Sequence, residues 1–268
     1  MVDIDVSVII PTYNSSLTIE NTILSVIRQT YIPTQFEILV IDDGSTDDTA
    51  MIVEKLAREN EGFSIKLIKK SNSGVSSTRN VGIKNARFSW VMFLDSDDIW
   101  IESKIATQLE TINGNPKIDF LGGNVSPALT SIPLVGVLPN LYKVRTWDLL
   151  IKWVPQTSTV LVRKAVLEQI GMYDESMKYA EDGDLYLRIA ENYNFYVQQV
   201  QLVEYGGGKR MFGVSGLSGN LKGMFRGNLT ILKKAYRRQT LSRSGYILFY
   251  LWNVIKYFRR LMIVKIGR

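Results

Sequence analysis

The stretch Trp90-Val-Met-Phe-Leu-Asp-Ser-Asp-Asp-Ile-Trp100 joins an apolar run of strand length to a cluster of carboxylates. Side chains two residues apart in an extended backbone point the same way, so Asp95 and Asp97 are expected to lie side by side where a buried strand ends. Two hard oxygen donors suit a divalent cation that keeps some waters and also binds a phosphate oxygen. The plainer interpretation is a strand followed by an acidic turn, because Asp and Ser are common turn residues.

Apolar runs of strand length alternate, around this stretch, with segments that carry apolar residues at helical spacing. The predicted strands cover residues 6–10, 36–41, 65–68 and 90–94, and the predicted helices cover residues 17–29, 46–60, 76–86 and 101–112. This alternation is typical of an α/β fold with a mainly parallel sheet and helices on both faces. Ligands in such sheets bind beyond the carboxyl ends of the strands, so the polar junctions there form the candidate site.

The second half of the chain is less regular. Residues 120–155 contain several glycines and prolines, and we expect loops and short strands there. The remaining elements are a predicted strand at 157–163, a short helix at 164–170 that stops at Gly171, a helix at 184–192 and an edge strand at 195–203.

The composition excludes several kinds of chemistry. The 268 residues include no cysteine and no histidine, which removes disulfides, thiolate nucleophiles, Cys-ligated zinc and imidazole bases. Acid–base chemistry must then come from Asp, Glu, Lys or Tyr, and any metal must have oxygen ligands. The first five residues contain neither a basic segment nor a long apolar run, so we expect no secretory signal.

Charge is distributed unevenly along the chain. The net charge is +6, but the segment from Lys209 to Arg268 holds 14 of the 32 Lys and Arg residues and no Asp or Glu. The residues before it therefore carry 18 basic against 26 acidic side chains. A basic tail on an acidic body indicates an anionic partner for the tail, either a membrane surface or a nucleic acid.

Five polar segments follow one another at the junctions between the predicted elements. They are Val6–Asn14, Val40–Ser45, Asn72–Asn80, Leu94–Asp98 and Glu181–Arg188. Together they resemble the successive motifs of the family 2 inverting glycosyltransferases of the GT-A fold, of the bacterial cell-envelope polysaccharide type. An isolated Asp-Asp-Gly-Ser could also be the phosphoacceptor corner of a receiver-like domain, which would leave the other motifs unexplained. The resemblance covers roughly residues 6–203.

The resemblance implies a division of the chain. A GT-A-like (Rossmann-like) catalytic domain is expected over residues 1–208, with the nucleotide-sugar half at about 1–115 and the acceptor half at about 116–208. A basic helical tail follows at 209–268. Glycosyl transfer requires that this domain hold the nucleoside, neutralise the departing diphosphate and deprotonate the acceptor hydroxyl.

Three residues are expected at the nucleoside. The resemblance implies that Pro11, Tyr13 and Asp43 contact it, with the carboxylate of Asp43 accepting from a uracil N–H and the ring of Tyr13 stacking on the base. Outside this context, Pro11 would simply end a strand and Asp43 would support the turn at Gly44.

The diphosphate charge is expected to meet a Mn²⁺ or Mg²⁺ ion, which stabilises developing negative charge without proton transfer. The resemblance implies that Asp97 is a direct metal ligand, and that Asp95, next to Ser96 in the donor site, binds either the metal or the ribose. Many relatives add a histidine ligand near the end of the domain. This chain has none, so we expect either that water fills that position or that Lys209 or Arg210 stabilises the diphosphate instead.

Charged and polar side chains from other motifs complete the predicted chemistry. The guanidinium of Arg79, in the first turns of a predicted helix, is expected to reach phosphate oxygens. The resemblance implies that Asp182 is the base that takes the acceptor proton in a single inverting displacement. Glu181, Gln156 and Thr157 are expected to bind the acceptor or the donor sugar. By themselves, an Asp at a helix start is more often a cap, and a lone arginine is usually a surface residue.

The basic tail ends in an apolar and aromatic segment. Its uncharged part, Tyr246–Ile255, is shorter than the roughly 20 apolar residues of a spanning helix. We expect an amphipathic helix on an anionic membrane, which would place the protein on the cytoplasmic face of the cell membrane beside a glycan or polyprenyl-linked acceptor. The alternative is a helical pair packed on the domain or on a second copy, in a homodimer. No nucleic acid is expected, because no nucleic-acid motif accompanies the charge.

The sequence thus predicts a metal-assisted inverting glycosyltransferase that uses a nucleotide sugar, expected to be a UDP-sugar. One alternative is a metal-dependent sugar nucleotidyltransferase, although such enzymes carry a Gly- and Arg/Lys-rich loop where this chain has Pro11-Thr-Tyr-Asn14. Another is a membrane-bound nucleotide-sugar-binding module without turnover.

Overall fold

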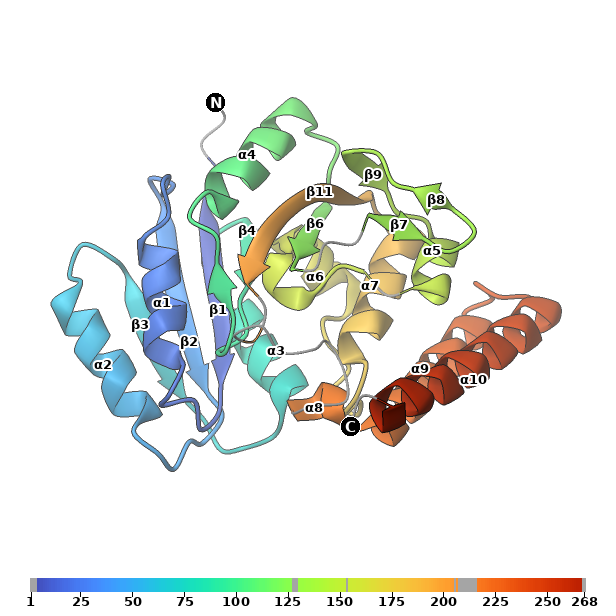
Figure 1. The fold of residues 1–268 in the computed structure, drawn as a ribbon. Coiled ribbons are helices and arrows are strands. Elements are labelled where there is room, and N and C mark those ends of the chain that lie inside the picture. The colour runs from blue at the N-terminus through green and yellow to red at the C-terminus, as the bar shows by residue number, and fades with distance from the viewer. Residues whose placement is uncertain (1–3, 127–129, 153, 205, 207–215, 267–268) are drawn as a thin grey trace.

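The computed structural model describes residues 4–126, 130–152, 154–204, 206 and 216–266 (Figure 1). The strands of its main sheet are β1 (Val6–Thr12), β2 (Phe36–Asp42), β3 (Ile65–Lys69), β4 (Trp90–Phe93), β5 (Ile99–Trp100), β6 (Phe120–Val125), β9 (Leu141–Lys143), β10 (Leu161–Arg163) and β11 (Phe195–Glu204). They follow the order β3-β2-β1-β4-β10-β6-β11-β5, with β9 also paired to β11. A separate hairpin joins β7 (Ser131–Ile132) to β8 (Gly136–Val137).

Helices cover both faces of the sheet (Figure 1). One face carries α1 (Ile19–Ile27), α2 (Thr49–Glu59) and α4 (Lys104–Gly114). The other carries α3 (Val75–Asn85), α5 (Thr146–Ile151), α6 (Lys164–Ile170) and α7 (Glu181–Asn192), followed by α8 (Gly216–Gly219), α9 (Leu221–Arg237) and α10 (Arg243–Ile266). The predicted mainly parallel α/β sheet is confirmed, with β10 antiparallel to both of its neighbours.

The first strands show why continuous apolar runs form this fold. Ile9 and Phe93 belong to the core on one face, whereas Val8 and Met92 belong to the core on the other. Because successive side chains alternate between two covered faces, most positions must be apolar, and the buried exceptions Ser7 and Glu37 are hydrogen-bonded to each other at 2.7 Å. The strands and helices predicted over residues 6–112 are therefore confirmed, apart from the short strand β5.

The expectation of loops and short strands over residues 120–155 is confirmed apart from helix α5, and one of these strands, β6, lies inside the sheet and is buried throughout. Its two glycines mark close packing: a Cβ at Gly122 would lie 2.1 Å from Cγ of Pro155, and one at Gly123 would lie 2.3 Å from Cδ1 of Leu202. Glycine in a strand can signal such close approach as well as a break.

Two strands differ from the prediction. The segment predicted as a strand at 157–163 starts with the 3₁₀ turn η1 (Thr157–Thr159), in which the side chain of Gln156 accepts a hydrogen bond from Ser158 N, and only then enters β10. β11 is not an edge strand, because β6 pairs with one side of it and β5 and β9 pair with the other.

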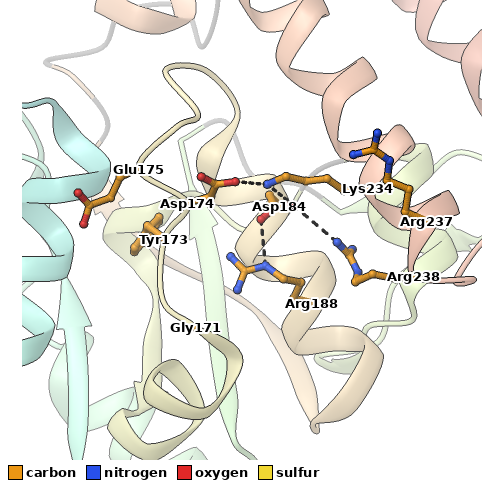
Figure 2. A pocket seen from close by; sticks show the side chains of 9 residues that line it. All are labelled: Gly171, Tyr173, Asp174, Glu175, Asp184, Arg188, Lys234, Arg237 and Arg238. Carbon is orange, nitrogen blue, oxygen red and sulfur yellow. Dashed lines mark hydrogen bonds and ion pairs between the residues drawn. The ribbon is translucent and has the colours of Figure 1, made fainter.

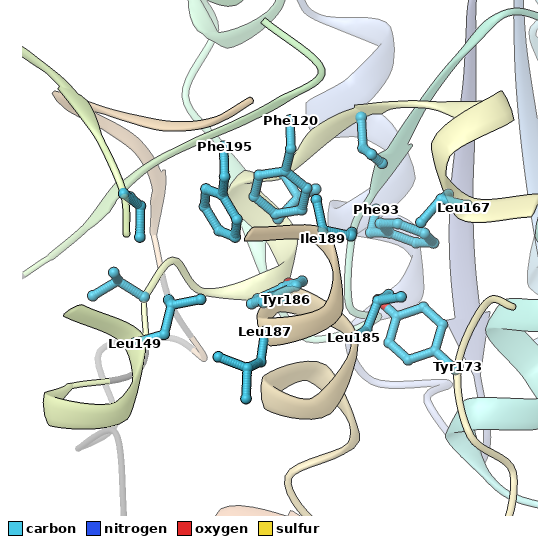
Figure 3. Close-up of a cluster of buried hydrophobic side chains, with 14 of the residues drawn as sticks. Phe93, Phe120, Leu149, Leu167, Tyr173, Leu185, Tyr186, Leu187, Ile189 and Phe195 are labelled. Atoms are coloured by element: carbon cyan, nitrogen blue, oxygen red, sulfur yellow. The ribbon is translucent and has the colours of Figure 1, made fainter. Parts of the chain in front are cut away.

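Helix α7 forms the centre of the core on its face of the sheet (Figure 3). The ring of Tyr186 packs edge-on against Phe120, with ring centroids 5.1 Å apart, and its hydroxyl donates to Oγ1 of Thr157 at 3.1 Å. The helix begins at Glu181, three residues before the predicted start, after Ala180 in a left-handed conformation with φ of 57°. The first turn of α7 is thus held firmly against the sheet.

The basic tail forms a helical hairpin that packs on the domain. Ile231 and Leu232 of α9 and Phe249 of α10 belong to the same core as α7. Nε1 of Trp252 donates to the carbonyl oxygen of Ile151 at 3.0 Å. Among the described residues, no helix combines the length and apolar character that crossing a bilayer requires. Packing on the domain agrees with the alternative prediction for the tail, whereas membrane contact and a homodimer stay predictions.

Candidate active site

The residues predicted to hold the nucleoside meet at the carboxyl ends of two neighbouring strands. Pro11 lies in β1 opposite Ile41 of β2, and the backbone N–H of Asp43 donates to the carbonyl of Thr12 at 2.9 Å. Tyr13 follows directly and leaves 51% of its surface exposed. This exposed ring above buried strand ends is available for stacking.

Asp43 also organises the neighbouring loop. Its Oδ1 accepts from the backbone of Ser73 at 2.9 Å and from the ammonium of Lys70, and its Oδ2 accepts from Gly74 N at 2.9 Å. Burial alone would raise the pKa of Asp43, but these donors outweigh it and lower the pKa. Asp43 therefore stays ionised and fixes the loop that precedes α3, while its contact with a base stays a prediction.

The Asp95–Asp98 segment is a turn. The backbone N–H of Asp98 donates to the carbonyl of Asp95 at 3.1 Å, so the expectation of extended backbone here is wrong. Cation binding by Asp95 and Asp97 stays a prediction. Leu94 ends the buried run, after which Asp95 is half-buried and Asp97 is exposed. Asp and Ser favour this turn because their short side chains bond to nearby backbone.

Asp98 is a site residue that the sequence prediction missed. Its buried carboxylate accepts from Oγ of Ser158 at 2.5 Å, from Nε2 of Gln156 at 2.9 Å and from Gly206 N at 2.7 Å. Burial, together with the charge of Asp95, raises its pKa to about 7. Gln156, which was expected at the sugar, therefore supports the acidic turn through its hydrogen bond to Asp98. The signal was the position of Asp98 directly before Ile99 and the buried Trp100.

Arg79 joins the two halves of the site. Its Nη2 donates to Oδ1 of Asp95 and its Nη1 to Oε1 of Glu181, both at 2.8 Å. Burial would lower the pKa of Arg79, but the charges of these two carboxylates outweigh it and raise the pKa. Because both terminal nitrogens hold carboxylates, the guanidinium positions these groups. Its Nε has no hydrogen-bond partner among the described residues, and the expected contact of Arg79 with phosphate stays a prediction.

Glu181 and Asp182 form the first turn of α7. Asp182 is half-buried, and its Oδ1 accepts from Gly183 N at 2.7 Å. Burial raises the pKa of Asp182, and burial together with the charge of Asp182 raises the pKa of Glu181. Since Arg79 engages Glu181, Asp182 is the carboxylate of this pair that faces the site without an arginine partner among the described residues.

Two remaining predicted residues serve mainly to connect elements. Oγ of Ser96 lies 2.8 Å from Oγ of Ser15, which links the acidic turn to the start of α1. Thr157 is buried against Tyr186 under α7. Lys209 and Arg210 lie outside the described residues.

The donor set of the acidic turn decides how a cation could bind. Among the described residues, no three acidic side chains come together as a metal site. Oδ1 of Asp95 already accepts from Arg79, so the turn offers Asp97 with partial help from Asp95. This suits an oxygen-seeking ion such as Mg²⁺ or Mn²⁺, which retains waters and takes further ligands from a substrate phosphate.

A cavity of about 540 Å³ between α7 and α9 contains none of the predicted site residues (Figure 2). Inside it, Lys234 of α9 pairs with Asp174 and, at 3.2 Å, with Asp184, while Nε of Arg188 donates to Asp184 at 2.9 Å. Asp174 and Asp184 thus each have a cationic partner, whereas Glu175, which also lines the cavity, accepts from Nδ2 of Asn80 at 2.9 Å. This cluster attaches the tail to the domain and is separate from the strand-end site.

A family model of known proteins matches this chain. The description "Glycosyl transferase family 2" covers residues 7–155, which is more than half of the chain. The chain belongs to glycosyl transferase family 2. This membership confirms the resemblance seen in the sequence and decides against the sugar nucleotidyltransferase.

Known members of the family include cell-envelope enzymes. An uncharacterised glycosyltransferase of Rickettsia conorii is 32% identical over 191 residues, covering 70% of this chain and 30% of that protein. The UDP-Glc:alpha-D-GlcNAc-diphosphoundecaprenol beta-1,3-glucosyltransferase WfgD of Escherichia coli is 39% identical over 125 residues, covering 46% of this chain and 47% of that protein. The matched regions thus span less than half the length of these relatives.

The solved structure of residues 1–349 of Staphylococcus aureus TarS, in complex with UDP-GlcNAc, has a similar fold. The TM-score is 0.71 at 23% identity, with 95% of this chain and 73% of that chain covered. The GT-A fold of the family 2 domain is thereby confirmed.

Proposed function

We propose that this family 2 glycosyltransferase moves a sugar from a UDP-sugar to a hydroxyl group of a glycan or lipid-linked acceptor, with inversion at the anomeric carbon. The observation that carries the proposal is the Arg79 bridge. It holds the acidic turn after β4 and the first turn of α7 together through two 2.8 Å contacts. A donor bound at the turn therefore lies next to Asp182.

The nucleoside part of the donor binds at the ends of β1 and β2. The exposed ring of Tyr13 stacks on the uracil, beside Pro11, and the ionised Asp43 accepts from its N–H. The loop that Asp43 fixes, through Ser73 and Gly74, closes this side.

The diphosphate lies over the acidic turn, where Asp97 and Asp95 hold Mn²⁺ or Mg²⁺. When bound, the cation offsets the negative charge that develops on the departing UDP. Asp98 supports the turn from below through Ser158 and Gln156. Support of this kind keeps the acidic turn in position before negative charge develops on the departing diphosphate.

Asp182 acts as the general base. The acceptor oxygen forms a bond to the anomeric carbon while the bond from that carbon to the phosphate oxygen breaks, the proton passes to Asp182, and UDP leaves. A base works best when its pKa lies near the working pH, and burial moves the pKa of Asp182 upward in that direction. Glu181 stays paired with Arg79 and borders the sugar.

We further propose that α10 rests on the cytoplasmic face of the cell membrane. It exposes apolar residues at helical spacing along its length. They are Ile247, Leu248, Leu251, Ile255, Phe258, Met262 and Ile266. Lys265 lies among them and Arg243 at the start of the helix, where cations meet anionic lipid.

Flotation with anionic vesicles tests the membrane contact. Leu251→Gln/Phe258→Gln should lose vesicle binding, because both side chains are more than half exposed and their removal leaves the core intact. Leu17→Gln/Leu134→Gln removes two exposed apolar side chains away from α10 and should float like the wild type. Equal flotation of both double variants would contradict the proposal.

A screen of nucleotide sugars with Mn²⁺ tests the enzyme itself. We expect UDP-sugars to raise the melting temperature and one of them to release UDP slowly in water. A chain that binds UDP-sugars but releases no UDP, with or without added acceptors, would instead be the non-catalytic binding module.

A further inference from the structure

A second cavity, of about 400 Å³, lies between the loop that precedes α7 and the start of α9. Three cationic side chains line it, Lys178 from the loop and Lys222 and Arg226 from α9, and none of its described lining residues carries a carboxylate. All three are exposed, and none forms an ion pair with any carboxylate in the described parts of the chain. The cavity between α7 and α9 in Figure 2 differs in this respect, because there the cations meet Asp174 and Asp184.

The loop and α9 pack closely against each other beside this basic cavity, the one lined by Lys178, Lys222 and Arg226. Gly223 and Gly227 lie one turn apart on α9 and face Tyr179 of the loop. A Cβ at Gly223 would lie 2.7 Å from the Tyr179 ring, and one at Gly227 would lie 2.4 Å from the Tyr179 carbonyl oxygen. Asn220 fixes the contact, with Nδ2 donating to the Tyr179 hydroxyl at 2.9 Å and Oδ1 accepting from Gly223 N at 2.8 Å. The cavity is therefore built by close backbone packing.

The loop that lines the basic cavity leads into the helix that carries the proposed base. Tyr179 precedes Asp182 by three residues, so their Cα atoms are at most about 11 Å apart. An acceptor that presents a hydroxyl to Asp182 can therefore place another of its groups between Lys178, Lys222 and Arg226. In a sugar phosphate, the reacting hydroxyl and the phosphate are attached to the same ring, which matches this short separation.

We propose that the basic cavity binds a phosphate group of the acceptor. Three cations without carboxylate partners, gathered in one concave wall, repel one another until an anion binds, and phosphate gives each of them a charge-assisted hydrogen bond. The hydroxyls of Ser176 and Thr230 line the same cavity and add neutral donors. The phosphate belongs either to the diphosphate of a lipid-linked sugar or to a polyol phosphate. This inference rests on the proposed function, because it takes Asp182 as the point where the acceptor reacts.

The test is calorimetry on the full chain with UDP and Mn²⁺ at saturation, so that the donor site is filled. Farnesyl diphosphate and glycerol 3-phosphate are the phosphate probes, and farnesol is the probe without phosphate. We expect Lys222→Gln/Arg226→Gln to weaken binding of the phosphate probes by about tenfold or more. The matched control Lys233→Gln/Arg237→Gln removes two exposed cations from α9 outside the basic cavity and should bind them like the wild type.

Each outcome bears on the inference. Tighter binding of farnesyl diphosphate supports a lipid diphosphate, and tighter binding of glycerol 3-phosphate supports a polyol phosphate. Equal weakening by both double variants, no binding of either phosphate probe by the wild type, or farnesol binding as tightly as farnesyl diphosphate would overturn it. A wild type that fails to bind UDP would defeat the proposed function, whereas normal UDP binding with phosphate affinity unchanged in Lys222→Gln/Arg226→Gln defeats this inference alone.

Discussion

Helix α7 takes part in two clusters of buried charge that behave differently. At its first turn, Arg79 holds Glu181, and the pKa values of Glu181 and Asp182 are raised. In the same turn, Asp184 meets Lys234 and Arg188. Burial would raise the pKa of Asp174 in this second cluster, but Lys234 and Ser176 lower it to about 2. Both clusters connect α7 to another part of the molecule.

The difference separates chemistry from attachment. In the cluster of Lys234, Arg188, Asp174 and Asp184, both carboxylates have a cationic partner, as expected where ion pairs hold two elements together. In the Arg79 cluster one guanidinium serves several carboxylates, so Asp182 keeps a raised pKa. Carboxylates with raised pKa values in a polar recess are typical of active sites. The comparison therefore supports the proposal that Asp182 is the base, and it assigns attachment of the tail to Asp174 and Asp184.

The largest effect is expected for Asp182→Asn. The amide cannot take the acceptor proton, so we expect the transfer rate to fall by about 10²–10⁴-fold. UDP affinity should stay unchanged, because the residue does not contact the nucleotide. Steady-state kinetics and UDP titration measure the two quantities. Asp174→Asn is the matched control, and a similar rate loss in both variants would remove the distinction between the clusters.

Arg79→Met should be the most destabilising single substitution in this comparison. It leaves the buried Glu181 and the half-buried Asp95 without their shared cation, which is expected to cost about 3 kcal/mol of unfolding free energy. Urea denaturation measures the loss. Adding Glu181→Gln should recover part of it, and an unchanged midpoint in Arg79→Met would show that the bridge is not formed in solution.

Lys234→Met should have a smaller effect. Lys234 is partly exposed and Arg188 remains beside Asp184, so we expect a loss of about 1 kcal/mol. Hydrogen exchange should show faster exchange in α9 and α10 and little change in the strands of the sheet. Equal acceleration throughout the domain would mean that the tail and the domain unfold as one unit.

The smallest expected effect is a loss of unfolding free energy at low pH that comes from Asp174. The pKa of Asp174 is about 2 in the folded chain, below its ordinary value of 3.8. The unfolded chain therefore takes up the proton first, and the stabilisation from Asp174, present above about pH 4, is lost as the pH falls towards 2. Because Asp174 is partly exposed, this stabilisation is limited to the order of 1 kcal/mol. The difference in unfolding free energy between wild type and Asp174→Asn should shrink over this range, and a constant difference would contradict the Lys234 contact.

The sequence was most informative where local pattern and burial agree. The continuous apolar runs of β1, β2 and β4 require two covered faces, which is why the sheet and its polar strand ends could be predicted. The place of β6 inside the sheet could not be predicted in this way. Its glycines make room for Pro155 and Leu202, and a local sequence pattern does not reveal contacts with residues so far along the chain. The tail helices followed from composition, but their place against α7 depends on packing.

The candidate site was predicted in part for a similar reason. Tyr13, Asp43 and Asp182 were identified from the motifs and their places at element ends, and the structure brings their elements together. The Asp95–Asp98 turn and the role of Asp98 depend on hydrogen bonds from Ser158 and Gly206, which lie far along the chain. Arg79 was identified as charged and near the site, but its partners are set by the tertiary structure.

A crystal of the full chain soaked with UDP and Mn²⁺ tests the central claim most directly. The account predicts uracil beside Tyr13 and Asp43, and anomalous density for manganese between Asp97 and the diphosphate. Nucleotide bound in either cavity along α9, or manganese bound away from Asp97, would contradict it.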